Sequence, residues 1–225
     1  MSSTYNIAID GPAGAGKSTI AKLVAAKLGF IYVDTGAMYR AMALYFLENG
    51  IQPEDEEKVS AACGQIDISL RYQDGVQQVI LNGRDVSGKI RTEAVGNAAS
   101  VVSAYRAVRQ ALLALQQNLA KTSNVIMDGR DIGTVVFPDA ELKLFVTASP
   151  EVRAKRRVDE LEAKGIPASY EEVLENVKKR DYIDSTREES PLRQADDALV
   201  LDNSHMTLEE QKAWLLEQYH KAIGS

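Results

Sequence analysis

The sequence has almost no cysteine, and it lacks features of secreted and membrane proteins. Cys63 is the one cysteine among 225 residues, which excludes an intrachain disulfide. No segment is long and apolar enough to span a membrane. The N-terminal sequence MSSTYN has neither a basic stretch nor an apolar signal core. We therefore expect a cytoplasmic protein with no membrane partner.

The chain also lacks an excess of positive charge. Its net charge is −6 and its pI is about 5.1, whereas general nucleic-acid binders are usually basic. We expect no nucleic-acid partner, and an anionic ligand would need a local cluster of cations. Arginines do cluster in the second half of the chain, at Arg153, Arg156, Arg157, Arg180, Arg187 and Arg193.

Short apolar runs alternate with helical patterns along most of the chain. The predicted strands are 5–10, 31–33, 124–128, 142–147 and 198–201. The predicted helices are 17–28, 37–49, 103–121, 150–164, 169–187 and 207–222. Strands that alternate with helices predict an α/β fold. Because the strands are almost continuously apolar, we expect a parallel sheet with helices on both faces.

Two segments depart from this alternation. Apolar and polar residues alternate from Ile66 to Tyr72, and Asp74-Gly75 and Asn82-Gly83 suit tight hairpin turns, which predicts a small antiparallel meander inserted between the second and third parallel strands. Residues 150–190 form two charged helices with little apolar surface, the first of them starting at Ser149-Pro150. This second segment has the character of a mobile flap.

The strongest motif lies directly after the first predicted strand. Residues 11–18, GPAGAGKS, match the phosphate-binding pattern G-x-x-x-x-G-K-[ST] and open a predicted helix. In this motif, backbone N–H groups and the helix N-terminus surround phosphate oxygens. Lys17 would reach the β- and γ-phosphates, and the Ser18 hydroxyl would join a magnesium shell. The alternative is a glycine-rich turn with an exposed lysine.

Charged residues follow the next two parallel strands. The strand at 124–128 ends in Asp128, where P-loop proteins often place an acid near magnesium, and Arg130 and Asp131 come next. Arg40 lies just after the second strand. Since ligands bind at the carboxyl edge of a parallel sheet, both arginines could reach one phosphate there. Surface ion pairing is the alternative for each of them.

Three residues of KKRDYIDSTRE have helical spacing. Arg180, Asp184 and Arg187 lie at i, i+4 and i+7, which would place them on one helix face. That face could line the cleft, with Arg187 on the phosphates. It could equally be a solvated face on which Arg180 and Asp184 form an ion pair. The spacing leaves both open.

Several motifs together resemble bacterial cytidylate kinases over almost the whole chain: IDGPAGAGKST, VDTGAMYRA, SGKIRTEAVGNAAS, DGRDIGTVVFPDA and KKRDYIDSTRE. The resemblance implies one P-loop kinase domain, 1–225, with parallel strand order 2-3-1-4-5 and an antiparallel three-stranded insertion. Its parts would be a core (about 1–35, 122–148 and 195–225), a monophosphate-binding part (about 36–121, with the insertion at 64–90) and a lid (about 150–190).

The resemblance also implies phosphorylation of CMP and dCMP by ATP with Mg²⁺, and it assigns residues. ATP would be bound by Gly11, Pro12, Ala13, Gly14, Ala15, Gly16, Lys17, Ser18, Thr19 and Arg157, and magnesium by Ser18. The substrate set would be Thr35 and Arg40 (acceptor phosphate), Arg130 and Arg187 (phosphates), Ser100, Arg109 and Asp131 (cytosine), and Arg180 and Asp184 (ribose). The catalytic residues would be Lys17, Arg130 and Arg187.

The cytosine assignment has a physical consequence. A carboxylate such as Asp131 can accept a hydrogen bond from the amino group of cytosine but not from the O4 atom of uracil, so we expect UMP to be a poor substrate. Other functions are another small-molecule kinase, of the adenylate or shikimate kinase type, and a non-catalytic nucleotide-sensing module. We expect a monomer, because no strongly apolar surface helix stands out.

Overall fold

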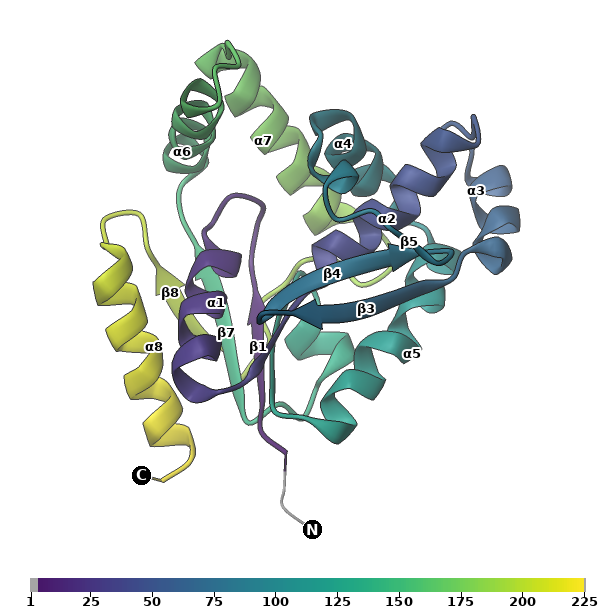
Figure 1. Ribbon diagram of the computed structural model, residues 1–225. Coiled ribbons are helices and arrows are strands. Elements are labelled where there is room, and N and C mark those ends of the chain that lie inside the picture. The colour runs from purple at the N-terminus through teal and green to yellow at the C-terminus, as the bar shows by residue number, and fades with distance from the viewer. Residues whose placement is uncertain (1–3, 225) are drawn as a thin grey trace.

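The computed structural model describes residues 4–224, and its centre is a parallel sheet (Figure 1). The sheet strands are β1 (Asn6–Asp10), β2 (Ile31–Asp34), β6 (Val125–Gly129), β7 (Leu142–Thr147) and β8 (Leu199–Asp202). Their order is β2-β6-β1-β7-β8, which is the expected 2-3-1-4-5 when the parallel strands alone are counted. Residues 1–3 and 225, which belong to the expected core, lie outside the described residues. Residues 1–3 are also the first half of the N-terminal sequence MSSTYN.

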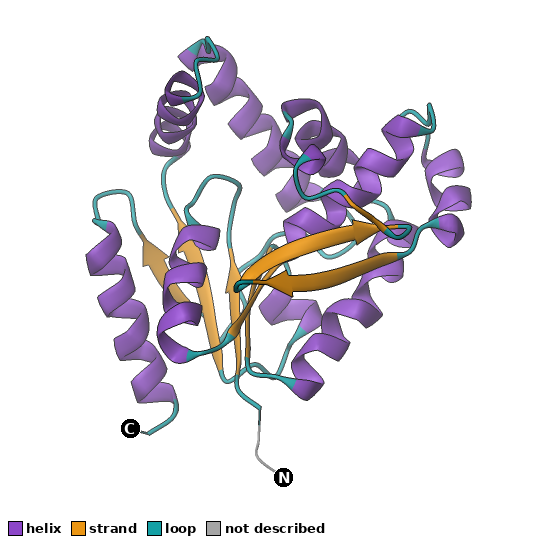
Figure 2. Ribbon diagram, viewed as in Figure 1, coloured by secondary structure: helices purple, strands orange, loops and turns teal. Residues whose placement is uncertain are grey.

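Helices cover both faces of this sheet (Figure 2). Ile7 and Ile9 of β1 pack toward α1 (Lys17–Leu28) and α8 (Leu208–Ala222). Ala8 points to the opposite face, where α5 (Arg106–Thr122) packs. Both faces of β1 are therefore buried, which explains why its sequence is continuously apolar. The edge strand β8 differs, because Leu199 and Val200 are exposed.

The expected meander is a separate three-stranded antiparallel sheet. It consists of β3 (Ile68–Gln73), β4 (Val76–Leu81) and β5 (Arg84–Asp85), in the order β3-β4-β5. Its two turns take positive φ at Asp74 (52°) and Asn82 (47°) as well as at the glycines that follow them. Val79 and Leu81 face a core shared with α2 (Thr35–Glu48), so the insertion rests on the helix that follows β2.

The helix predicted over 103–121 is wrong at its start. The chain instead forms α4 (Glu93–Val102), turns, and begins α5 at Arg106. The hydroxyl of Thr92 caps α4 by accepting from the N–H of Val95 at 3.4 Å. Four short elements were also not predicted: α3 (Glu56–Ala62), the 3₁₀ turns η1 (Cys63–Gln65) and η2 (Lys89–Arg91), and the π-helical η3 (Ile132–Val136).

The segment expected to be a flap forms two helices, α6 (Pro150–Ala163) and α7 (Tyr170–Thr186). They project beyond the sheet, and α7 returns to end beside α4 and α2 (Figure 1). Because α7 ends at Thr186, Arg187 lies after the helix, and the predicted three-residue stripe on one helix face is interrupted. Between residues 4 and 224, no helix has both the length and the apolar character of a membrane span.

Candidate active site

The P-loop joins β1 to α1, and its backbone requires glycine. A Cβ on Gly11 would lie 1.9 Å from the carbonyl oxygen of Val146 on β7, because the two chain segments are so close. Gly14 and Gly16 have φ values of 76° and 85°. Such conformations let consecutive N–H groups converge on an anion.

Lys17 lies inside this loop and is only 6% exposed. Its Nζ donates to the carbonyl oxygens of Gly11 and Pro12, each at 2.8 Å. Burial, and next the charge of Arg130, lower the pKa of Lys17. An anion placed in the loop would stabilise this buried ammonium group, so its surroundings suit a phosphate.

Ser18 and Asp128 bring two oxygen ligands together beside the P-loop. The Ser18 hydroxyl donates to Asp128 Oδ2 at 2.5 Å, and the Tyr32 hydroxyl donates to Oδ1 at 3.3 Å. Burial, and next the charge of Asp34, raise the pKa of Asp128 to about 6. Asp34 itself caps α2 and pairs with Arg40 at 3.0 Å.

These oxygens fit a magnesium ion that is shared with a phosphate. Mg²⁺ takes oxygen ligands, keeps several waters, and is usually bound by one or two protein groups plus substrate phosphates. Among residues 4–224 there is no group of three or more His, Cys, Asp or Glu side chains placed to hold a metal. The Ser18–Asp128 pair can therefore supply only part of a metal shell.

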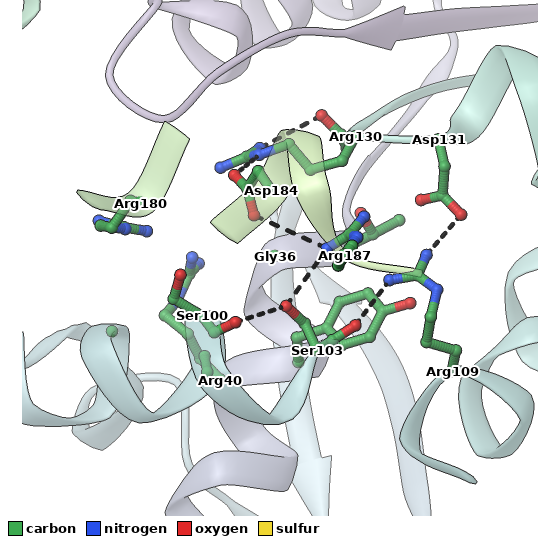
Figure 3. A pocket seen from close by; sticks show the side chains of 15 residues that line it. Gly36, Arg40, Ser100, Ser103, Arg109, Arg130, Asp131, Arg180, Asp184 and Arg187 are labelled. Carbon is green, nitrogen blue, oxygen red and sulfur yellow. Dashed lines mark hydrogen bonds and ion pairs between the residues drawn. The ribbon is translucent and has the colours of Figure 1, made fainter. Parts of the chain in front are cut away.

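A second pocket adjoins the cleft that contains the P-loop, and it gathers all of the predicted substrate residues (Figure 3). Its walls come from α2, α4, α5, α7 and the end of β6. Its charged lining is Arg40, Arg109, Arg130, Arg180, Arg187, Asp131 and Asp184, an excess of three positive charges. Thr35 and Ser100 complete the predicted set around it. Such a pocket favours a small polyanion.

Asp184 pairs with arginines other than the one that helix spacing suggested. Arg130 Nε donates to its Oδ2 at 2.7 Å, and an Arg187 nitrogen lies 3.7 Å from Oδ1. The alternative of an Arg180–Asp184 ion pair on a solvated face is therefore wrong, because Arg130 reaches Asp184 from the end of β6 and Asp184 is only 5% exposed. Within the described chain, Arg180 Nε is buried without a hydrogen-bond partner.

Arg109 and Asp131 form a buried ion pair across the same pocket. Arg109 also donates to the carbonyl oxygen of Ser103 at 3.0 Å, and it lies 5.3 Å from the centre of the Tyr39 ring. Among the residues the structure describes, the Ser100 hydroxyl is buried and has no hydrogen-bond partner. This wall of the pocket thus holds a carboxylate, a guanidinium and an unsatisfied hydroxyl.

The remaining predicted residues are also located. Thr35 Oγ1 donates to the carbonyl oxygen of Asp128 at 2.7 Å, which joins α2 to β6. Arg187 donates twice to the carbonyl oxygen of Ser190, at 2.9 and 2.7 Å. Arg157 pairs with Glu160 at 3.0 Å and lines the larger cleft that also contains Lys17 and Ser18. Thr19 is exposed on the first turn of α1.

Sequence reasoning missed several side chains that hold this site together. Arg153, 3% exposed, donates to Ala13 O in the P-loop at 3.1 Å and pairs with Asp181 on α7. Gln77 on β4 binds the backbone N–H and carbonyl of Asp34, at 2.8 and 3.2 Å. The arginine cluster was visible in the sequence, but no local pattern signals the contacts of Gln77.

Comparison with known proteins decides the family. A family model described as cytidylate kinase matches residues 7–221. The chain belongs to the cytidylate kinase family. A cytidylate kinase of Parabacteroides distasonis is 67% identical over 97% of this chain and 98% of its own length. One from Bacteroides fragilis is 55% identical over 96% of this chain and 97% of its own length.

The fold comparison agrees with an α/β architecture. A solved structure of an uncharacterized protein from Eubacterium ventriosum has a TM-score of 0.51 and 11% identity, covering 96% of this chain and 98% of that one. That likeness concerns the fold alone. Membership of the cytidylate kinase family does not favour the adenylate kinase, shikimate kinase or nucleotide-sensing alternatives. It implies a kinase that uses ATP and a divalent metal.

Proposed function

We propose that this chain transfers the γ-phosphoryl group of ATP to CMP or dCMP, which gives ADP and CDP or dCDP. The observation that carries the proposal, beside the family, is a pocket with five arginines and two aspartates next to a P-loop. A P-loop alone suits any nucleoside triphosphatase. The second, cationic pocket can bind a negatively charged acceptor for the phosphoryl group.

On the donor side, residues 11–19 bind the triphosphate of ATP. Lys17 exchanges its bonds to Gly11 O and Pro12 O for phosphate oxygens, and Arg157 approaches from the lid. Ser18 and Asp128 hold Mg²⁺, which supplies neutralisation of phosphate charge when bound. Asp34 is the less suitable ligand, since its carboxylate is occupied by Arg40 and by the N-terminus of α2.

On the acceptor side, the phosphate of CMP lies among Thr35, Arg40, Arg130 and Arg187. That phosphate is already an anionic nucleophile, so the reaction needs no general base. The protein contributes alignment of donor and acceptor and stabilisation of charge on the transferred group. Lys17, Arg130 and Arg187 carry the largest share of this stabilisation, because Lys17 and Arg187 are buried cations and Arg130 is a half-buried one.

The cytosine ring is recognised by Ser100, Arg109 and Asp131. Asp131 accepts from the amino group, while Arg109 and the unpartnered hydroxyl of Ser100 donate to the ring acceptors. The ribose lies against Arg180, whose Nε lacks a partner in the described chain, and against Asp184. Ser100, Arg109 and Asp131 are buried, so an unmatched base leaves a polar group unsatisfied.

A substrate panel tests the proposal. ADP release from ATP and Mg²⁺ is measured with CMP, dCMP, UMP and AMP side by side. We expect turnover of CMP and dCMP, and a kcat/KM for UMP that is lower by about tenfold to a hundredfold, since an unsatisfied buried group costs about 1–3 kcal/mol. Equal use of AMP, or binding of ATP without turnover of any monophosphate, would overturn it.

A further inference from the structure

Asp10, the last residue of β1, is a buried carboxylate that lines neither pocket. It is 4% exposed, and both of its oxygens accept hydrogen bonds from the same distant loop. Ile132 N donates to Oδ1 at 2.8 Å, and Gly133 N donates to Oδ2 at 2.7 Å. These two amides begin η3, directly after Arg130 and Asp131.

Keeping a charged group at this place is costly. Burial raises the pKa of Asp10 to about 6, the two backbone N–H groups oppose that rise, and the nearby Asp131 adds to it. No ion pair within residues 4–224 joins Asp10 to a cation. The charge of Lys17 also opposes the rise, but Lys17 forms no ion pair with Asp10. Burial of the Asp10 carboxylate is therefore offset mainly by its two hydrogen bonds to the backbone.

What the carboxylate can do is hold two consecutive amides at once. The first N–H groups of a helical turn have no partner within that turn, so Ile132 and Gly133 need acceptors from elsewhere. One oxygen would fix the position of the loop, whereas two oxygens fix its rotation as well. The backbone of Asp131 (φ −144°, ψ 25°) lies outside regular helix or strand geometry, so its neighbours alone do not set its direction.

The orientation of the loop of residues 130–133 determines where the side chains of Arg130 and Asp131 point. Arg130 reaches Asp184, and Asp131 reaches Arg109, from positions within two residues of the amides that Asp10 holds. A Cβ on Gly133 would lie 3.4 Å from Asp10 Oδ2 and 3.2 Å from the Lys143 side chain, so the loop also approaches closely. A rotation of the loop would therefore move both residues.

We propose that Asp10 is a positioning residue for the acceptor nucleotide. Its carboxylate orients the loop of residues 130–133 so that Arg130 and Asp131 face the phosphate and the base. This inference rests on the proposed function, because it assigns those two side chains to CMP. Asp10 acts only through the backbone and touches neither nucleotide.

The test compares Asp10→Asn with the unaltered protein. The amide is isosteric with the carboxylate but has one acceptor oxygen, so it turns an NH₂ group toward one of the two amides. We expect the Kd for CMP, measured by calorimetry, to rise about tenfold or more. The CMP-to-UMP ratio of kcat/KM should fall, while the KM for ATP changes less than about twofold.

Asp197→Asn is the control for the same chemical change at an exposed site. Asp197 pairs at 2.8 Å with Lys143, a residue of the neighbouring strand β7, and its carboxylate does not bind the loop amides. This variant should keep the CMP affinity and the preference for CMP. The positioning role is wrong if Asp10→Asn also keeps the CMP affinity and the CMP preference, or if it weakens the binding of ATP alone. A change in thermal stability does not alter this conclusion.

Hydrogen exchange on the unaltered protein gives a readout that does not depend on the variant folding. The amides of Ile132 and Gly133 should be strongly protected without any nucleotide, and exchange as fast as in an open loop would overturn the inference. The two proposals fail separately. If the unaltered protein does not phosphorylate CMP, the proposed function is wrong; if it does and Asp10→Asn retains full selectivity, only the role of Asp10 is wrong.

Discussion

The proposed role of the Arg109–Asp131 pair in base recognition can be separated by mutation from its contribution to stability. Both side chains are nearly buried, 9% and 6% exposed. Both line the second pocket, with its five arginines and two aspartates, which is called the acceptor pocket below. Replacement of either one leaves a buried charge without its partner. Replacement of both, as in Arg109→Met with Asp131→Leu, removes the two charges together and fills similar volume with apolar atoms.

The expected magnitudes follow from this burial. Removal of one partner of a buried ion pair destabilises a protein by about 3–5 kcal/mol, whereas an apolar replacement of the whole pair is roughly neutral or stabilising. Arg109→Met also loses the bond to Ser103 O and the contact with the Tyr39 ring, which favours the upper end of that range. For a chain of this size, each single variant should lower Tm by about 6–20 °C.

The assay pairs thermal unfolding, followed by circular dichroism, with CMP-dependent ADP release. We expect two unstable single variants and a double variant with Tm close to that of the unaltered protein. All three should lose the preference for CMP over UMP. A double variant whose Tm is as low as that of the less stable single variant would refute the electrostatic argument. Undiminished CMP preference in any of the three variants would refute the role of the pair in base recognition.

Other substitutions make further predictions. Arg187→Ala should keep the far-UV spectrum but lower turnover by about 10²–10³-fold, the usual effect of removing a charge-stabilising donor; near-normal turnover would contradict its role. Gln77→Met should raise the KM for CMP about threefold to tenfold by releasing Asp34 and thus Arg40, while Gln78→Met, which loses a bond to Gln73, should not. Native Asp10 keeps its proton between pH 3.8 and about 6, so its contribution to stability falls as the pH rises through that window. Urea unfolding should therefore show Asp10→Asn gaining about 3 kcal/mol relative to the unaltered protein from pH 4 to pH 7, and a constant difference would count against the raised pKa.

The inner strands β1 and β6 were predictable because burial on both faces makes each of them an apolar run, and β8 was predictable from its apolar run although Leu199 and Val200 are exposed. The helix α4 was not predicted, although its buried residues have helical spacing from Val95 to Val102. Gly96 lies in its middle and alanines form much of its buried side, so its apolar signal is small. The early start of α2 depends on Asp34, whose carboxylate caps the helix.

The site was predictable where it depends on strand ends, since Arg40, Arg130 and Asp131 follow strands whose carboxyl ends meet. Pairing within the site was not predictable. Helix spacing favours Arg180 as the partner of Asp184, but Arg130, 54 residues away in sequence, takes that place. Asp10 binds amides 122 and 123 residues away, and no local pattern can carry that information.

Helix α7 limits how this enzyme can be redesigned. It has 17 residues and is thus about 26 Å long, and it runs from the outer end of the flap to Asp184 in the acceptor pocket. Exchange of residues 150–187 with the corresponding segment of another kinase would transplant Arg180, Asp184 and Arg187 along with the flap. If these three residues bind the acceptor nucleotide as proposed, a chimaera made to alter use of the phosphoryl donor would also change the nucleoside preference.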